Sequence, residues 1–202
     1  LIGGKILQSC SLKLKERFPE EEFVPFLDAS PIPEVKTAAA AGLGVVWENG
    51  LLITEKYGSY VFLGEIVTTM SLPAPAGQAA PCLRCGLCKK VCPGGAIGRN
   101  GEIDPSRCAS ALSQKKGKLS REEEKIIKGS GKIFGCDLCQ EVCPLNRRAQ
   151  EGIPDFRRDI LNRLAPGQAE KIYKDRAFGW RGPAVLERNL ALWREENSED
   201  EA

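Results

Sequence analysis

The chain has 202 residues, of which 42% are hydrophobic and 28% are charged, a balance typical of a globular protein with its own core. The formal net charge of +2 excludes strong nonspecific binding of polyanions through global charge, but not local basic patches. No apolar run reaches the roughly 20 residues that span a bilayer, so we expect no membrane partner.

The first third of the chain mixes helical and extended patterns. Apolar residues at helical spacing predict a helix over 5–18, with Cys10 on its buried face. FVPFL (23–27) is typical of a short strand, and EVKTAAAA (34–41) of a helix that stops at Gly42. VVW (45–47) and LLI (51–53) flank Asn49-Gly50, a pair that favours a hairpin turn, and a second extended stretch covers 60–70. Segment 1–72 is therefore expected to be an α/β domain.

Prolines and small residues predict a linker over 73–81, ahead of a Cys-rich module at 82–148. Within the module, Asp104-Pro105 predicts the start of one helix, and Ser120 with Glu123 predicts a capping box at the start of another. Helical patterns dominate a tail at 149–194, and an acidic end at 195–202 is expected to be disordered. The predicted fold class is α+β.

The cysteines carry the strongest chemical signal. The chain has nine Cys and no His, and eight of the Cys lie between residues 82 and 143, in Cys-x-x-Cys spacings followed by Pro. Such spacings indicate metal or cluster ligands in a reducing compartment, so we expect a cytoplasmic location. The first run, CLRCGLCKKVCP (82–93), has the C-x₂-C-x₂-C-x₃-C-P pattern of bacterial ferredoxins. Zinc is the alternative, but it prefers two separated Cys pairs.

The second run, GCDLCQEVCP (135–144), lacks its leading Cys, because Ile133 stands at that position. One Cys of the module, Cys108, belongs to neither run and is expected on a helix between them. In ferredoxins with two 4Fe–4S clusters, the fourth Cys of each run binds the other cluster. That logic assigns Cys82, Cys85, Cys88 and Cys143 to cluster 1, and Cys92, Cys108, Cys136 and Cys139 to cluster 2.

The segments that flank the cysteines occur in a characteristic order. They are FLDASPIPEVKTAAAAGLG (26–44), NGLLI (49–53), YGSYVFLGEI (57–66), the eight Cys, RCASAL (107–112) and GCDLCQEVCPLNR (135–147). This series resembles the epoxyqueuosine reductase family, cobalamin-dependent relatives of the reductive dehalogenases. The resemblance runs from about residue 26 to residue 148, with a weaker echo in RGPAVLERNLAL (181–192).

The resemblance implies reduction of epoxyqueuosine to queuosine at the wobble position of tRNA. Electrons would pass through the two 4Fe–4S clusters to a base-off cobalamin held by a partial cobalamin-binding domain at 1–72. The implied partners are tRNA carrying epoxyqueuosine and reduced ferredoxin or flavodoxin as electron donor. We expect a monomer with a ferredoxin-like double 4Fe–4S module at 82–148 and a short helical tail.

The family's proton-donating Asp lies in a V-D-[ST]-x-P motif, on which Leu27-Asp28-Ala29-Ser30-Pro31 aligns. Release of oxygen from an epoxide consumes two electrons and two protons, so a general acid near the departing oxygen is needed. A carboxyl group would serve if burial raised its pKa. The resemblance therefore makes Asp28 the candidate acid; by itself, this residue would be read as a turn residue before Pro.

The resemblance also points to cofactor contacts from Asn49, Gly50, Ser59, Tyr60, Ser110 and Ser113. Read alone, these positions fit a hairpin turn, the entry to a strand and a solvated helix face. Two features depart from the family: Glu48 stands where relatives carry a cation, and relatives have a longer N-terminal segment. Two rival functions stay open: a two-cluster electron carrier without a corrinoid, and a corrinoid reductase that acts on another substrate.

Overall fold

The computed structural model describes residues 2–28, 30–73, 82–153, 161, 163–176 and 178–199. These residues form two compact units: Leu1–Arg84 with Pro144–Arg158, and Cys85–Cys143 with Asp159–Ala202. The first unit therefore takes in residues that follow the last Cys, and the second takes in the C-terminal helices. The domain boundaries expected from the sequence stay a prediction.

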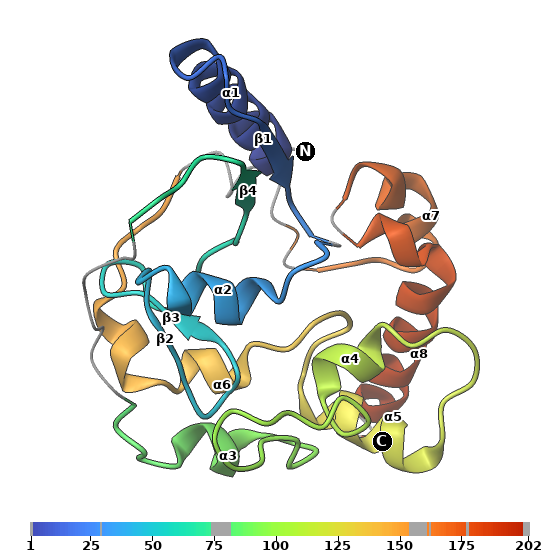
Figure 1. Cartoon of the computed structure of the whole chain (residues 1–202). Coiled ribbons are helices and arrows are strands. Elements are labelled where there is room, and N and C mark those ends of the chain that lie inside the picture. The colour runs from blue at the N-terminus through green and yellow to red at the C-terminus, as the bar shows by residue number, and fades with distance from the viewer. Residues whose placement is uncertain are drawn as a thin grey trace. The chain divides into compact units, whose positions relative to one another are not determined.

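The first unit begins with helix α1 (Ile2–Arg17), which packs against the antiparallel pair β1 (Phe23–Phe26) and β4 (Glu65–Thr68). In Figure 1 the helix runs beside β1 at one end of this unit. Phe23 pairs with Thr68, and Phe26 pairs with Glu65. Pro25 is tolerated because a strand in a two-stranded pair needs only part of its N–H groups for the ladder.

The buried face of α1 differs from the predicted one. Cys10 is exposed, and its neighbour Ser11 is buried with its hydroxyl donating to the carbonyl of Phe23 at 2.7 Å. Ile6 is also exposed, at 43%. The prediction of a buried Cys10 was wrong because a hydrogen bond to the edge of β1 turns Ser11 inward, which rotates the apolar positions partly outward.

Helix α2 (Glu34–Ala40) packs against a second antiparallel pair, β2 (Val45–Val46) and β3 (Leu52–Ile53). The predicted hairpin is confirmed: Gly50 has a φ of 74° and donates to the carbonyl of Trp47 at 2.8 Å. Trp47, Leu52 and Ile53 are each at most 5% exposed and form the core here. The short helix η1 (Pro144–Arg148) belongs to the same unit.

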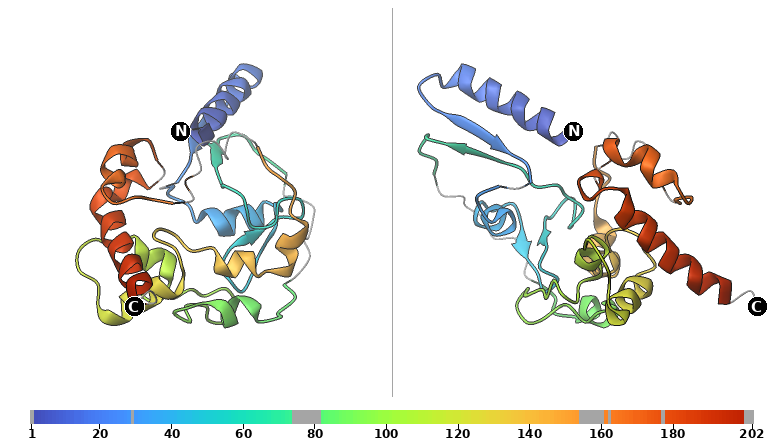
Figure 2. Two further views of the ribbon diagram at one scale, coloured as in Figure 1. Left: turned by 180° about the vertical axis from the view of Figure 1, so that it is seen from behind. Right: turned by 90° about the vertical axis from the view of Figure 1, so that its right-hand side faces the viewer.

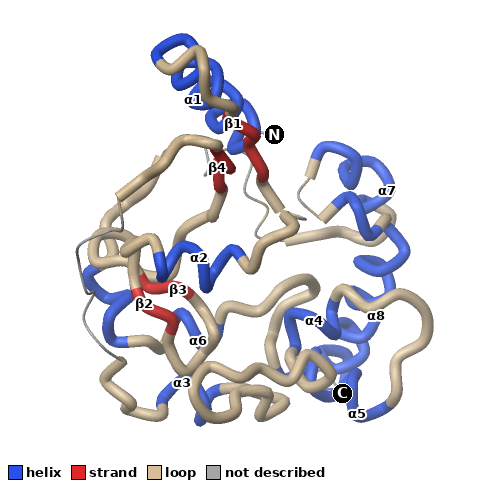
Figure 3. Tube along the Cα trace, viewed as in Figure 1, coloured by secondary structure: helices blue, strands red, loops and turns tan. Residues whose placement is uncertain are grey.

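The second unit is helical (Figures 2 and 3). Its α-helices are α3 (Leu87–Val91), α4 (Ala109–Ser113), α5 (Arg121–Gly129), α6 (Leu138–Glu141), α7 (Gln168–Ile172) and α8 (Pro183–Glu199), with 3₁₀ turns η3 (Tyr173–Asp175) and η4 (Gly179–Arg181). Its core is formed by Ala109, Leu112, Ile126 and Ile127, with Leu119 and Cys136 packed against it. The predicted capping box opens α5: Ser120 accepts from the N–H of Glu123, and Glu123 accepts from the N–H of Ser120.

Two predictions about helices were wrong. Asp104-Pro105 opens a turn rather than a helix, because the Asp104 carboxylate accepts from both the N–H and the hydroxyl of Ser106. Helix α4 starts later, at Ala109, so Cys108 precedes the helix instead of lying on it.

The acidic end was expected to be disordered from 195, but α8 continues to Glu199; residues 200–202 lie outside the described residues. None of the described helices is long and apolar enough to cross a membrane.

Candidate functional site

From Cys85 to Cys143 the cysteines belong to the second unit, where the two runs lie beside each other, whereas Cys82 falls in the first unit. Cys88 lies in α3 and Cys139 in α6, and these two short helices pack together. Gly86 precedes α3 with a φ of 71°, a left-handed conformation that suits glycine. The sequence separates the runs by more than 40 residues, so the fold, rather than the local pattern, brings their thiols to one place.

Cys108 is anchored to the end of the first run. The Arg107 guanidinium donates from Nε to the carbonyl of Gly94 at 2.6 Å, which ties the chain before α4 to the turn after Cys92. A Cβ on Gly94 would lie 1.9 Å from the carbonyl oxygen of Arg107, so only glycine allows this approach. The sequence argument did not single out Arg107, although it stands in the RCASAL segment.

The thiols of the predicted cluster 2 influence one another electrostatically. Burial raises the pKa of Cys136, the Leu138 N–H opposes this rise, and the charges of Cys108, Asp137 and Cys92 add to it. Burial raises the pKa of Cys139 to about 12, with further contributions from Cys136, Cys108, Cys88 and Cys92. Because Fe–S ligation requires thiolates, iron must supply the positive charge that keeps these buried groups deprotonated. The structure thus brings Cys92, Cys108, Cys136 and Cys139 together, while their assignment as one ligand set stays a prediction.

Backbone N–H groups point at two of the sulfurs. Arg84 donates to Sγ of Cys82 at 3.4 Å, and Ala96 donates to Sγ of Cys92 at 3.2 Å. Such hydrogen bonds stabilise a charged sulfur and are one way in which proteins set cluster potentials. Within the described residues, no three Cys, Asp or Glu side chains converge on a single-ion site; a cubane instead distributes its four thiolates over four irons. The eight Cys between residues 82 and 143 match the number of thiolates that two such clusters need.

Asp28 follows β1 at the start of the loop that leads to α2. It is exposed and has a φ of 55°, an uncommon value for a residue other than glycine and one that Asp adopts more readily than most. Strained backbone of this kind is often found at functional sites. The sequence argument expected burial of this carboxyl group, whereas the structure leaves it accessible.

Two further carboxylates accompany Asp28, and the sequence argument missed both. Burial, followed by the charges of Glu65 and Asp28, raises the pKa of Glu34, and the backbone N–H of Asp28 works in the opposite direction. Within the described residues, one carboxylate oxygen of Glu34 and one of Glu65 are buried without a hydrogen-bond partner. Glu65 pairs across the ladder with Phe26, two residues before Asp28, which explains why sequence distance hid this grouping.

Of the four candidate cofactor residues in the first unit, Asn49, Gly50 and Ser59 have roles in the fold, and Tyr60 is exposed. Asn49 is buried and accepts from the N–H of Leu51 at 3.3 Å, which shapes the Asn49-Gly50 turn. Ser59 is also buried and exchanges two hydrogen bonds with Asn146: its N–H donates to Oδ1 at 2.9 Å, and its hydroxyl accepts from Nδ2 at 2.7 Å. Tyr60 is 52% exposed, so its ring is accessible to a ligand.

Gly58 explains why Asn146 can reach Ser59. A Cβ at Gly58 would lie 2.2 Å from Oδ1 of Asn146, and its φ of 58° also favours glycine. Asn146 is therefore a structural partner of the YGSY segment. In the sequence, its presence in the segment GCDLCQEVCPLNR was the one local feature that could have indicated this role.

The two candidate residues in the second unit differ in accessibility. Ser113 is 1% exposed; its hydroxyl donates to the carbonyl of Ser110 at 2.8 Å and accepts from the N–H of Gly135 at 3.0 Å. These bonds hold the segment just before Cys136, so the Ser113 hydroxyl serves the fold. Ser110 is half-buried, and its contact with a cofactor stays a prediction.

Comparisons with known proteins agree with this picture. The family model of a 4Fe-4S double cluster binding domain matches residues 81–146. Epoxyqueuosine reductase from Listeria monocytogenes is 32% identical over 189 residues, which is 89% of this chain and 49% of that protein. The chain spans about half the length of the curated relatives it matches.

Solved structures give the same result for the fold. The epoxyqueuosine reductase of Streptococcus thermophilus has a TM-score of 0.80 and 28% identity, over 95% of this chain and 53% of that one. An epoxyqueuosine reductase solved with a tRNA-Tyr epoxyqueuosine-modified tRNA stem loop has a TM-score of 0.74 and 28% identity, over 90% of this chain and 52% of that one. The resemblance predicted from the sequence is confirmed.

Proposed function

We propose that this chain, a relative of the epoxyqueuosine reductases in sequence and fold, holds two 4Fe–4S clusters and the acid for epoxyqueuosine reduction on tRNA. The observation that carries the proposal is the placement of Cys108. It stands outside both cysteine runs, yet it directly precedes α4, whose Ala109 and Leu112 belong to the core against which Cys136 of the second run packs. A thiol at this position supplies the ligand that Ile133 cannot.

The cysteines would serve as the electron path. Cys82, Cys85, Cys88 and Cys143 would hold cluster 1, and Cys92, Cys108, Cys136 and Cys139 would hold cluster 2. Cys92 follows α3 directly, so each run contributes ligands to both clusters, and the crossing keeps the two clusters close. Each cluster passes one electron at a time, and the reaction consumes two.

Asp28 would supply a proton. Conversion of an epoxide to an alkene takes up two electrons and two protons and releases the oxygen as water, so a general acid at the departing oxygen lowers the barrier. An exposed carboxyl group at the start of a loop can approach a substrate, and a bound substrate and cofactor would supply the burial that favours the protonated form.

Cobalamin is the cofactor that the family implies, and when bound it would supply the reducing equivalents at the substrate. Tyr60 offers an accessible ring, and the carboxamide of Asn49, oriented by its bond to Leu51, could donate to a corrin amide. Residues from the first unit therefore fit such a group. The substrate, tRNA carrying epoxyqueuosine, is supported by the relative solved with a modified stem loop, and tRNA modification would place the protein in the cytoplasm.

Two measurements on the anaerobically reconstituted protein test the proposal. The first is titration with cob(II)alamin, followed by EPR at cobalt, where a saturating base-off signal is expected. The second is incubation with an anticodon stem–loop carrying epoxyqueuosine and a chemical reductant, followed by mass spectrometry of the nucleosides, where queuosine is expected. An unchanged cobalt signal and no queuosine, with about eight irons bound, would identify a two-cluster electron carrier instead.

A further inference from the structure

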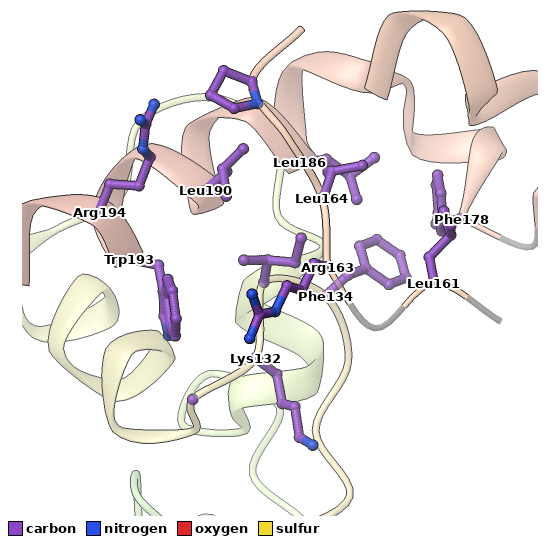
Figure 4. Close-up of a pocket in the computed structure, with 13 residues that line it drawn as sticks. Lys132, Phe134, Leu161, Arg163, Leu164, Phe178, Leu186, Leu190, Trp193 and Arg194 are labelled. Carbon is purple, nitrogen blue, oxygen red and sulfur yellow. The ribbon is translucent and has the colours of Figure 1, made fainter. Parts of the chain in front are cut away.

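A pocket of about 750 Å³ lies within the second unit, apart from the residues assigned above. Leu186 and Leu190 of α8, which are 2% and 7% exposed, form part of its wall. Phe134 and Phe178 meet with ring centroids 5.7 Å apart. Figure 4 shows these two rings at one end of the pocket and Trp193 at the other. Trp193 is 42% exposed, so a large aromatic surface is accessible.

The charged residues among the described lining of the pocket are all cationic. They are Lys132, Arg163 and Arg194, and no Asp or Glu is among the described residues that line it. Lys132 forms a half-exposed ion pair with Glu141 at 3.6 Å. Among the described residues, Arg163 and Arg194 have no hydrogen-bond or ion-pair partner. Apolar walls with two guanidinium groups that pair with no carboxylate of the described residues favour a partner that carries carboxylates around an apolar patch.

The pocket is connected to a candidate cluster ligand through a fixed segment. Phe134 of the pocket is two residues before Cys136, so their Cα atoms are at most about 7 Å apart. Asn189 of α8 donates to the carbonyl of Ile133 at 2.7 Å, and Gly135 donates to Ser113. Because α8 both lines the pocket and holds this segment, a partner seated on the pocket would lie close to cluster 2.

We propose that this pocket is the docking surface for the electron donor, an acidic one-electron carrier protein whose carboxylates surround an exposed apolar edge near its own redox group. This inference rests on the proposed function, because the reaction consumes two electrons that the chain must take from outside. In each encounter the reduced carrier loses one electron and an oxidised cluster gains it, and two encounters supply one epoxide reduction. Transient redox complexes need only a small contact surface.

RNA fits the pocket less well. Recognition of a base needs hydrogen-bonding groups for its edge as well as stacking. Among the described side chains of the pocket, the three cations and the Trp193 indole can form hydrogen bonds, and the rest are aliphatic or aromatic. These four groups are donors and none is an acceptor, whereas base edges present both donors and acceptors. The walls therefore match an apolar protein surface better than a nucleotide.

The test is stopped-flow reduction of the oxidised clusters in the reconstituted protein, with reduced flavodoxin as the acidic carrier. The Arg163→Glu/Arg194→Glu double variant is expected to lower the second-order rate constant about 10-fold or more at low ionic strength, and the difference should shrink as salt is added. The Arg163→Gln/Arg194→Gln double variant should give an intermediate rate. Iron content and circular dichroism establish that both variants fold.

Lys116→Glu/Lys118→Glu is the matched control, because both lysines are exposed in the same unit, outside the pocket, and the change in net charge is the same. Its rate should equal that of the unmodified protein, and photoreduced deazariboflavin, a small neutral reductant, should reduce all the proteins equally fast. The proposal would be overturned if the Arg163→Glu/Arg194→Glu variant and the lysine control were reduced by flavodoxin equally slowly, or if neither were slower than the unmodified protein. Unchanged reduction combined with lost binding of a tRNA stem–loop would assign the pocket to RNA. Cluster reduction does not depend on epoxide turnover, so failure of the proposed function would be seen separately.

Discussion

Asn189 joins three parts of the second unit, so its replacement is expected to destabilise that unit strongly. The side chain is 1% exposed, and its Nδ2 donates to the carbonyls of Ser113 and Ile133, each at 2.7 Å. Asn189→Leu keeps the number and branching of the side-chain heavy atoms, removes both bonds from Nδ2 together with the Oδ1 that accepts from the Arg188 guanidinium, and leaves two buried carbonyls without this donor. At about 1–2 kcal/mol for each carbonyl, the loss should be about 2–4 kcal/mol.

Thermal unfolding of the reconstituted protein, followed by circular dichroism at one fixed scan rate, measures this effect. For a chain of this size, 1 kcal/mol corresponds to about 2–4 °C, so the midpoint should fall by about 5–15 °C. Gln114→Leu is the control: it removes one half-buried bond, from Nε2 to the carbonyl of Ser110 at 3.0 Å, and should cost at most about 1 kcal/mol. A midpoint within 2 °C of the unmodified protein for Asn189→Leu would refute the argument that this residue holds α8 to the segment before Cys136.

Three further predictions concern the candidate site. Cys108→Ser should lower bound iron from about eight to about four per chain, because cluster 2 loses a ligand, whereas Cys10→Ser, at an exposed thiol, should leave iron content unchanged. Asp28→Asn should keep both clusters and lower epoxide turnover at least about 100-fold, the typical contribution of a general acid; turnover within a factor of two would remove Asp28 from the mechanism. The folded pKa of Glu34 is raised above the ordinary 4.5, so its favourable contribution is complete below pH 4.5 and is lost as pH rises through the folded value. Glu34→Gln should therefore be more stable than the unmodified protein at pH 7 and equal to it near pH 4, by denaturant unfolding at both pH values; equal stability of the two proteins at pH 7 would contradict this expectation.

Local sequence signals determined much of this protein. The cysteine spacing predicted the double cluster module that the family comparison matches at 81–146. The Asn49-Gly50 turn and the capping box at Ser120 formed as expected, because each depends only on residues within three or four positions. The prediction of a helix start at Asp104 was wrong. A short Asp side chain can cap a helix or form a turn, and here the carboxylate of Asp104 accepts two hydrogen bonds from Ser106 in a turn.

Tertiary structure decided what lies together across long sequence distances. Glu65 comes close to the Asp28 loop only because β4 pairs with β1, and Asn189 reaches Ser113 and Ile133 only because α8 folds back onto the cluster module. Ser11, rather than Cys10, lies on the buried face of α1 because its hydroxyl donates a hydrogen bond to the Phe23 carbonyl. The walls of the cationic pocket come from residues 131–134, from α8, and from Leu161, Arg163, Leu164, Pro166 and Phe178. Sequence periodicity describes one element at a time, so the fold had to supply these contacts.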